Sequence, residues 1–303
     1  MGMSYWHQHA ALPWAEPLEF ASGHAHGDIA LLYSSVQETF SGGVSYLFTH
    51  PLETVSGTDW AALPALPDAA EALPIWVGHL GYGMREDGAR GSDSPVSLPD
   101  FSLTRYGQLF CFDHHRRIIT QHVAAGEIID DVQPKKSLQS TELPAISCLS
   151  SNFTREAYEA VIAKTVEQIH AGNFYQANIT RKFFGAFQST PDSWQIFTRL
   201  SEASPAPYSA YIRRGSTAIL SSSPECFLSI DASGKMLTRP IKGSARRSED
   251  ATTDAEIQCA LKTSQKNHAE NLMIVDLMRN DLSRVSIPQT VKVIEQSTLY
   301  SYR

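Results

Sequence analysis

Short alternations of apolar and polar residues dominate the first 125 residues of the chain. Such alternation is typical of β-strands with one buried face. Residues 1–30 show weak periodicity, and residues 51–74, rich in proline and alanine, are expected to form a loop with one short helix. The alternation predicts a mostly-β region with strands at 29–33, 44–49, 75–83, 102–106, 109–113 and 118–123.

Helical spacing replaces this alternation after residue 150. Apolar side chains recur at intervals of three and four residues from Tyr158 to Ile169, Asn152 or Thr154 can cap this helix, and Gly172 fits its end. The same reasoning predicts helices at 192–203, 254–263 and 267–278, and strands at 175–183, 208–213, 218–222, 226–230, 235–239 and 290–294.

These elements together predict an α+β fold with antiparallel sheets and helices packed outside them. Residues 130–150 are polar and include Pro134 and Pro144, which marks the best candidate for a domain boundary. We therefore expect a mostly-β domain at residues 1–135 and a second domain at residues 150–303.

Composition and charge narrow the classes of function. The 303 residues carry a formal net charge of −7, which argues against broad nucleic-acid binding. No apolar run reaches the roughly 18 residues of a membrane span, and the N-terminus lacks the segments of a secretory signal. The four cysteines are scattered, without the spacing of a zinc site or a disulfide framework. We expect a cytoplasmic protein that spans no membrane.

The segment Lys242-Gly243-Ser244 is the strongest candidate for chemistry, because it places an amine directly after a predicted strand. Lysine is a poor nucleophile at neutral pH, but burial or nearby cations lower its pKa, and three arginines lie within five residues of Lys242. Gly243 allows a close backbone approach, and its N–H with that of Ser244 could hold a carboxylate. The alternative is a surface lysine in a basic loop.

Two glutamates flank this segment in the sequence. Glu225 follows a proline between two predicted strands and could act as a general acid; the alternative is an exposed glutamate in a turn. Glu270 heads the apolar helix 267–278, which we expect to be buried, and could offer an oxygen to Mg²⁺. The alternative for Glu270 is an ion pair with Lys266, one helical turn earlier.

Several motifs along the chain occur in an order that is typical of one family. They are Leu31-Leu32-Tyr33-Ser34, segments 78–82, 99–101, 151–158 and 172–178, Ser223-Pro224-Glu225, Pro240-Ile241-Lys242-Gly243-Ser244, and the stretch from Ala269-Glu270-Asn271 to Val285. In this order they resemble the chorismate-utilising enzymes: anthranilate synthase component I, aminodeoxychorismate synthase component I, and isochorismate and salicylate synthases. The resemblance implies the fold of anthranilate synthase component I.

Two positions discriminate within this family. Isochorismate and salicylate synthases carry a water-activating lysine where this chain has Gln176, which argues against water as the nucleophile. Anthranilate synthases carry a motif similar to Pro-Ile-Ala-Gly-Thr at this place in the sequence, and this chain has Lys242 in place of the alanine. The chain thus resembles aminodeoxychorismate synthase component I, a transferase of p-aminobenzoate and folate synthesis. Anthranilate synthase component I is the alternative enzyme.

The resemblance also implies a role for each candidate residue. Lys242 would attack C2 of chorismate and expel the 4-hydroxyl, which Glu225 would protonate. Glu270 would help hold Mg²⁺ against the ring carboxylate, and Gly243 and Ser244 would donate backbone N–H groups. Ammonia from a glutamine amidotransferase partner would then open the adduct at C4, giving 4-amino-4-deoxychorismate.

A second pocket, in the N-terminal domain, binds tryptophan in relatives. Ser34 and Pro207-Tyr208-Ser209 match the walls of that pocket, which makes tryptophan a candidate ligand. The usual aromatic-Ser-Arg-aromatic segment is replaced near Phe40-Ser41-Gly42-Gly43, and this departure argues against tryptophan binding.

The chain stops before motifs with which relatives continue. These are a histidine motif, a Gly-Ala-Pro-Lys segment, a glycine-rich carboxylate-binding loop and the second Mg²⁺ glutamate. The resemblance therefore implies a fold that is incomplete at the C-terminus, with residues 150–303 as the N-terminal part of the catalytic domain and little or no synthase activity for the chain alone. The non-enzyme alternative is an inactive remnant that only binds the amidotransferase subunit or a ligand.

Overall fold

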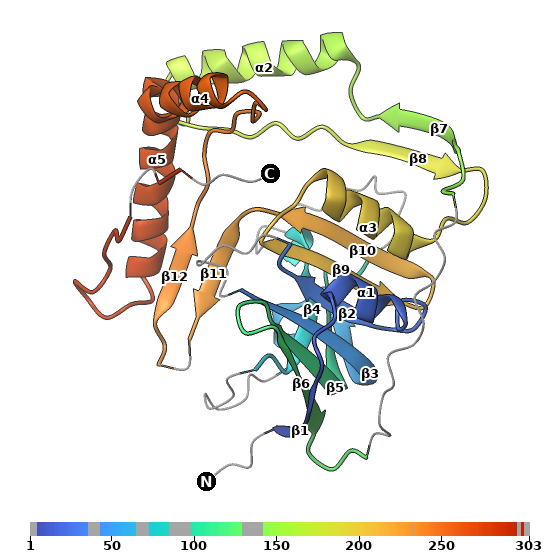
Figure 1. The fold of residues 1–303 in the computed structure, drawn as a ribbon. Coiled ribbons are helices and arrows are strands. Elements are labelled where there is room, and N and C mark those ends of the chain that lie inside the picture. Colours follow the sequence, from blue (N-terminus) through green and yellow to red (C-terminus); the bar gives the residue numbers. More distant parts are fainter. Residues whose placement is uncertain are drawn as a thin grey trace.

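An eight-stranded antiparallel sheet dominates the computed structural model, which describes residues 5–35, 43–64, 73–84, 98–128, 142–231, 233–295 and 298–299 (Figure 1). Its strand order is β1-β6-β5-β3-β2-β9-β10, and β4 pairs with β5 beside this path. The strands are β1 (Trp6–Leu12), β2 (Ala30–Tyr33), β3 (Val44–Gly57), β4 (Trp76–Leu80), β5 (Phe101–Asp113), β6 (Ile118–Ala124), β9 (Tyr208–Arg214) and β10 (Thr217–Ser223).

Apolar side chains cover both faces of this sheet. Successive residues of a strand point to opposite faces, so the neighbours Leu47 and Phe48 belong to two different buried clusters. Helices α1 (Pro17–Ser22) and α3 (Ser193–Ala203) pack on the face that holds Leu47, and Figure 1 shows both helices against the sheet. The predicted α+β fold with antiparallel strands and outer helices is confirmed.

The remaining described elements are two small sheets and three longer helices. Strands β7 (Ile146–Ser151) and β8 (Phe183–Phe187) pair with each other, and β11 (Cys226–Ile230) and β12 (Met236–Arg239) form a hairpin. The helices are α2 (Arg155–His170), α4 (Ala251–Thr263) and α5 (Gln265–Ser283), and single 3-10 turns lie at Trp60–Ala62 and Tyr82–Met84. No helix in the described ranges is long and apolar enough to cross a membrane.

Side-chain caps start the helices close to the positions that the sequence predicts. Thr154 caps α2 by accepting a hydrogen bond from the Ala157 amide at 3.2 Å. Asp192 and Ser264 cap α3 and α5 in the same way. Gly172 follows α2 with a φ of 78°, which is the left-handed conformation that commonly ends a helix.

Two parts of the first 74 residues differ from the prediction. Strand β3 continues through Pro51 to residue 57, where a loop was expected. The pairing of β3 with β5 shifts register directly after Pro51, and such an irregularity is where a strand tolerates a residue without an N–H group. The weakly periodic N-terminal residues form β1 and α1, and α1 begins at Pro17, a residue preordered for a first helical turn.

The strands predicted at 175–183 and 290–294 are also wrong. Residues 175–182 have no strand partner, and the Ile179 carbonyl instead accepts a hydrogen bond from the Tyr158 hydroxyl of α2 at 3.1 Å. Residues 290–294 have no regular secondary structure. Strand β7, in contrast, overlaps the segment 130–150 that was expected to be a linker. An alternating sequence becomes a strand only where another strand can pair with it.

The large sheet draws on both halves of the chain. Strand β9 pairs with β2, with Ser209 opposite Tyr33, and α3 packs on the same sheet. Residues 129–141, which include part of the predicted boundary, lie outside the described residues. The division into domains at 1–135 and 150–303 stays a prediction.

Candidate active site

A cavity of about 440 Å³ lies between the β11–β12 hairpin, α5 and residues 291–295 and 298–299. Thr238 of β12 links the hairpin to the helix, because its hydroxyl donates to the Phe227 carbonyl at 2.7 Å and lies 3.8 Å from Met278 Sδ. Figure 1 shows α5 running beside β12. The loop of residues 240–250, which connects β12 to α4, therefore begins in the wall of the cavity.

Lys242, Gly243 and Ser244 all line this cavity. The Lys242 side chain is exposed. Gly243 has a φ of 76°, and a Cβ at this position would lie 2.8 Å from Cγ of Asn267, in the first turn of α5. Both the left-handed backbone and the close approach to α5 therefore favour glycine here. The approach of a substrate carboxylate to the Gly243 backbone stays a prediction.

Cationic side chains dominate the charged lining of the cavity. Among the described residues that line it, the single carboxylate is Glu295, whereas the Lys and Arg residues are Arg239, Lys242, Arg247, Lys262, Arg279 and Lys292. A concave surface with this excess of positive charge attracts small anions.

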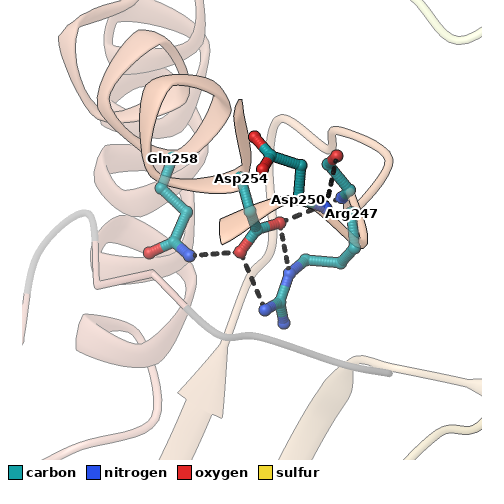
Figure 2. Close-up of polar contacts among 5 residues, drawn as sticks. Arg247, Asp250, Asp254 and Gln258 are labelled. Atoms are coloured by element: carbon teal, nitrogen blue, oxygen red, sulfur yellow. Dashed lines mark hydrogen bonds and ion pairs between the residues drawn. The ribbon is translucent and has the colours of Figure 1, made fainter. Parts of the chain in front are cut away.

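Asp254 of α4 anchors one of these cations, Arg247 (Figure 2). The guanidinium donates from Nε to Oδ1 and from Nη2 to Oδ2 of Asp254, both at 2.8 Å. The Ser248 amide donates to Oδ1 at 3.1 Å, and Gln258 Nε2 donates to Oδ2 at 2.9 Å. Hydrogen bonding to Arg247, Ser248 and Gln258 holds the pKa of Asp254 well below its usual range, and the same ion pair raises the pKa of Arg247.

Glu225 lies beside the cavity rather than in its wall. Its neighbours Pro224 and Cys226 line the cavity, but Glu225 is not among the lining residues and its side chain is exposed. The Glu225 amide donates to Ser223 Oγ at 3.3 Å, as in a turn. The general-acid role of Glu225 thus stays a prediction.

Glu270 lies in α5 and forms the ion pair that the spacing allows. Its Oε1 is 3.8 Å from Lys266 Nζ, and its side chain is 32% exposed. Glu270 does not line the cavity, although the nearby His268 and Asn271 do. The described ranges of the chain contain no group of three His, Cys, Asp or Glu residues that could hold a metal ion.

The expectation that helix 267–278 is buried is wrong. No residue of α5 is buried, and Leu272 and Leu277 are 50% and 37% exposed. The hairpin and residues 291–295 and 298–299 face α5 across the cavity, so they leave part of its apolar surface uncovered.

The residues predicted to line a tryptophan pocket are brought together where β2 and β9 pair. Ser34, Pro207 and Ser209 are buried, and Tyr208 is half-buried. The Ser34 amide donates to Ser45 Oγ at 3.0 Å, so this wall is hydrogen-bonded to β3. Residues 40–42, which replace the aromatic-Ser-Arg-aromatic segment of relatives, lie outside the described residues. Tyr208 also lines the cavity next to Lys242.

Sequence reasoning missed the side chains that hold the 240–250 loop in place. Asn267 and Asp254 contact this loop from α5 and α4, and neither belongs to a short motif that would reveal the contact. It also missed three cations of the lining, which come from separate segments: Lys262, Arg279 and Lys292. Only the fold places these residues beside Lys242.

Similarity to known proteins is consistent with this site. An aminodeoxychorismate synthase component 1 from Salmonella typhimurium is 35% identical over 246 residues, which cover 78% of this chain and 54% of that protein. The protein of the same name from Klebsiella aerogenes is 37% identical over 239 residues, which cover 77% of this chain and 51% of that protein. The chain therefore spans about half the length of the curated relatives it matches.

A solved structure and a family model complete the comparison. Anthranilate synthase component I from Streptococcus pneumoniae superposes with a TM-score of 0.66 at 20% identity, covering 86% of this chain and 66% of that one, and shows the fold alone. The model of the chorismate binding enzymes matches residues 30–303, which include the large sheet from β2 onwards and the whole cavity. The chain belongs to the family of chorismate binding enzymes.

Proposed function

We propose that the chain contributes the Lys242 part of an aminodeoxychorismate synthase component I, an enzyme that converts chorismate and ammonia to 4-amino-4-deoxychorismate for p-aminobenzoate and folate synthesis, and that the chain alone has little or no synthase activity. The observation that carries this proposal is the position of Lys242, an amine in the wall of a cationic cavity. Chorismate is a dianion, so the excess of Lys and Arg suits it. The names of the Salmonella and Klebsiella relatives support the same assignment.

Lys242 would be the nucleophile of the first step. Its neutral amine would attack C2 of chorismate, both conjugated ring double bonds would shift, and the C4–O bond would break, while the attacking nitrogen loses a proton to solvent. Glu225 would give its proton to the departing hydroxyl, which leaves as water. Ammonia would then bond to C4 as the bond between C2 and Lys242 breaks, and the net reaction exchanges a hydroxyl for an amine. Gly243 and Ser244 would donate backbone N–H groups to a substrate carboxylate.

Mg²⁺ is the proposed cofactor, and Glu270 its proposed ligand in this chain. Mg²⁺ commonly takes only one or two protein carboxylates and completes its shell with substrate and water, so one partly exposed carboxylate fits it once Lys266 releases Glu270. Bound Mg²⁺ would neutralise charge on the substrate carboxylate. Replacing Glu270 with glutamine is expected to weaken the dependence of chorismate binding on Mg²⁺.

Partners follow from the same proposal. The relatives are named component 1, which implies a second component, and we propose a glutamine amidotransferase that supplies the ammonia. Tryptophan binding between Ser34 and Pro207-Tyr208-Ser209 is a separate proposal, supported by the way the fold brings these residues together. We propose a cytoplasmic location for the chain and its partner.

Chorismate binding by the purified chain, measured calorimetrically with Mg²⁺, tests the proposal. Replacing Lys242 with alanine should weaken binding about tenfold, since it removes one charge-assisted contact. The matched control is Lys235→Ala, which removes an exposed lysine from the β11–β12 turn, outside the cavity lining. Equal affinity of the two variants, or no binding by the unaltered chain, would contradict the proposal.

Product analysis in the presence of ammonia separates the alternatives. Formation of 4-amino-4-deoxychorismate supports the proposal, whereas anthranilate would identify the alternative synthase. The expectation that the chain alone has little or no synthase activity stays a prediction, and turnover at the rate of a full-length relative would overturn it.

A further inference from the structure

Asp254 is an unusual residue for its surroundings. Asp254 is the only buried residue in the described part of the chain that is C-terminal to Ile212, and 6% of its surface is exposed. A carboxylate is costly to bury unless hydrogen bonds replace its water. The Asp254 carboxylate has four such bonds, two from Arg247, one from the Ser248 amide and one from Gln258. A side chain satisfied on both oxygens acts as an anchor for whatever donates to it.

The donors show what Asp254 anchors. Arg247 and Ser248 lie at the end of the loop that carries Lys242, and Gln258 lies one turn further along α4. Figure 2 shows the Arg247 side chain reaching back to the first turn of α4, where Asp254 sits. A planar guanidinium bound through two nitrogens fixes direction as well as distance. The far end of the loop is therefore tied to α4.

The loop is also held at two other points. At its start, Thr238 on β12 is hydrogen-bonded to the Phe227 carbonyl. In its middle, Gly243 is in close contact with Asn267 of α5. Lys242 lies in a segment without regular secondary structure, between the contacts at Thr238 and Gly243, and the Asp254 anchor holds the loop beyond Gly243. Loss of the Asp254 anchor would leave the residues after Gly243 held only by the contact with α5.

We propose that Asp254 is a positioning residue, which ties Arg247 and Ser248 to α4 and thereby fixes Lys242 in the cavity wall. Arg247 itself lines the cavity, so the same anchor sets where this cation faces a bound anion. Asp254 is not in the lining and acts only through its partners. The inference about the loop stands on contacts within the chain, and its consequence for Lys242 chemistry rests on the proposed function.

Limited trypsin digestion of the ligand-free chain tests the anchor. Cleavage after Arg246 should be several-fold faster in Asp254→Asn than in the unaltered chain, because the loop end is released. Asp250→Asn is the matched control: it removes the same charge from the start of α4, keeps a capping side chain, and does not touch Arg247. Cleavage at the control rate in Asp254→Asn would overturn the inference.

A second variant guards against a loss of folding. Arg247→Gln breaks the same ion pair by changing its more exposed partner. Cleavage after Arg246 should again be faster, and the helical circular dichroism should be unchanged. If Arg247→Gln is cleaved at the rate of the unaltered chain, the inference fails even where Asp254→Asn does not fold.

The rate at which chorismate modifies Lys242, measured at saturating chorismate without ammonia, tests the consequence for the site. Asp254→Asn should slow this modification more than it weakens chorismate binding, and Asp254→Glu should restore part of the rate. If Asp254 only stabilised the fold, neither Asp254→Asn nor Asp254→Glu would change the rate of modification relative to the affinity for chorismate. If the loop is released in Asp254→Asn but the rate of Lys242 modification is unchanged, the positioning role is wrong. If the loop is released in Asp254→Asn but chorismate does not modify Lys242 even in the unaltered chain, only the proposed function is wrong.

Discussion

Two regions of the molecule bury very different side chains. The sheet region consists of the eight-stranded sheet with α1, α3 and the described loops and turns that adjoin them, and it contains all of the buried apolar residues of the described chain. The hairpin region consists of β7, β8, β11, β12, α2, α4, α5 and the segments between them that the structure describes, and its single buried residue is Asp254. Large apolar side chains of the hairpin region, such as Phe227 and Leu149, are 78% and 66% exposed.

This difference shows how the site is held. The cavity with Lys242 lies mainly in the hairpin region, where no apolar residue of the described chain is buried. Its loop is positioned instead by helix caps, by the contact between Gly243 and Asn267, and by the ion pair of Arg247 with Asp254. Stability should therefore be concentrated in the sheet region, whereas chorismate binding should depend on polar contacts in the hairpin region.

The largest expected effect compares one substitution in the two regions. Phe110→Ala removes a fully buried ring that lies 4.9 Å from the Phe20 ring, and it should lower the free energy of unfolding by about 3–5 kcal/mol. Phe227→Ala removes the same atoms from an exposed position and should change it by less than about 0.5 kcal/mol. Urea denaturation followed by circular dichroism measures both. Similar losses in the two variants would show that the contrast between the regions is wrong.

A smaller effect is expected from two glycines of the hairpin region. Gly243 and Gly234 have φ values of 76° and 80°, so alanine at either position should cost about 1–2 kcal/mol of strain. Only at Gly243 would the added Cβ meet another residue, Asn267, whereas Gly234 has open space around it. Gly243→Ala should therefore weaken chorismate binding in calorimetry, and Gly234→Ala should not.

A double variant sharpens this comparison. Asn267→Ala removes Cγ and Nδ2, the two nearest atoms that the new Cβ would meet, and leaves Cβ at 3.2 Å, so it should recover part of the chorismate affinity that Gly243→Ala loses. No recovery in the double variant would mean that backbone strain, rather than contact with α5, is responsible.

The smallest expected effect is a dependence on pH. The folded state lowers the pKa of Asp254, so its ion pair adds stability above the unfolded pKa of about 3.9, and that stability is lost as the pH falls through the folded pKa. The difference in urea stability between the unaltered chain and Asp254→Asn should be constant from about pH 8 to about pH 5 and shrink in stronger acid. A difference that declines between these two pH values would contradict a lowered pKa.

The sequence predicts elements well where local chemistry decides them. Thr154 and Gly172 mark the ends of α2, and the alternation around Leu47 and Phe48 marks β3. Prediction failed where a distant partner decides, as at residues 175–182, which alternate but have no strand beside them. It also failed for α5, whose apolar residues predicted a burial that the described chain does not provide.

The site shows the same division between local and distant information. Lys242-Gly243-Ser244 could be recognised because a strand, an amine and a flexible turn follow one another in sequence. The pairing of Arg247 with Asp254 could not be predicted, since these two ordinary charged side chains are seven positions apart with a helix cap between them. The positions of Glu225 and Glu270 outside the cavity lining likewise depend on side-chain direction, which the sequence does not encode in a motif.

Mass spectrometry of the chain treated with chorismate and Mg²⁺, without ammonia, tests the central claim most directly. The account predicts a modification on Lys242 with the mass of chorismate less one water, absent from Lys242→Ala and discharged when ammonia is added. A chain that binds chorismate but carries no modification on Lys242, or carries it on another lysine of the lining such as Lys262, would contradict the account.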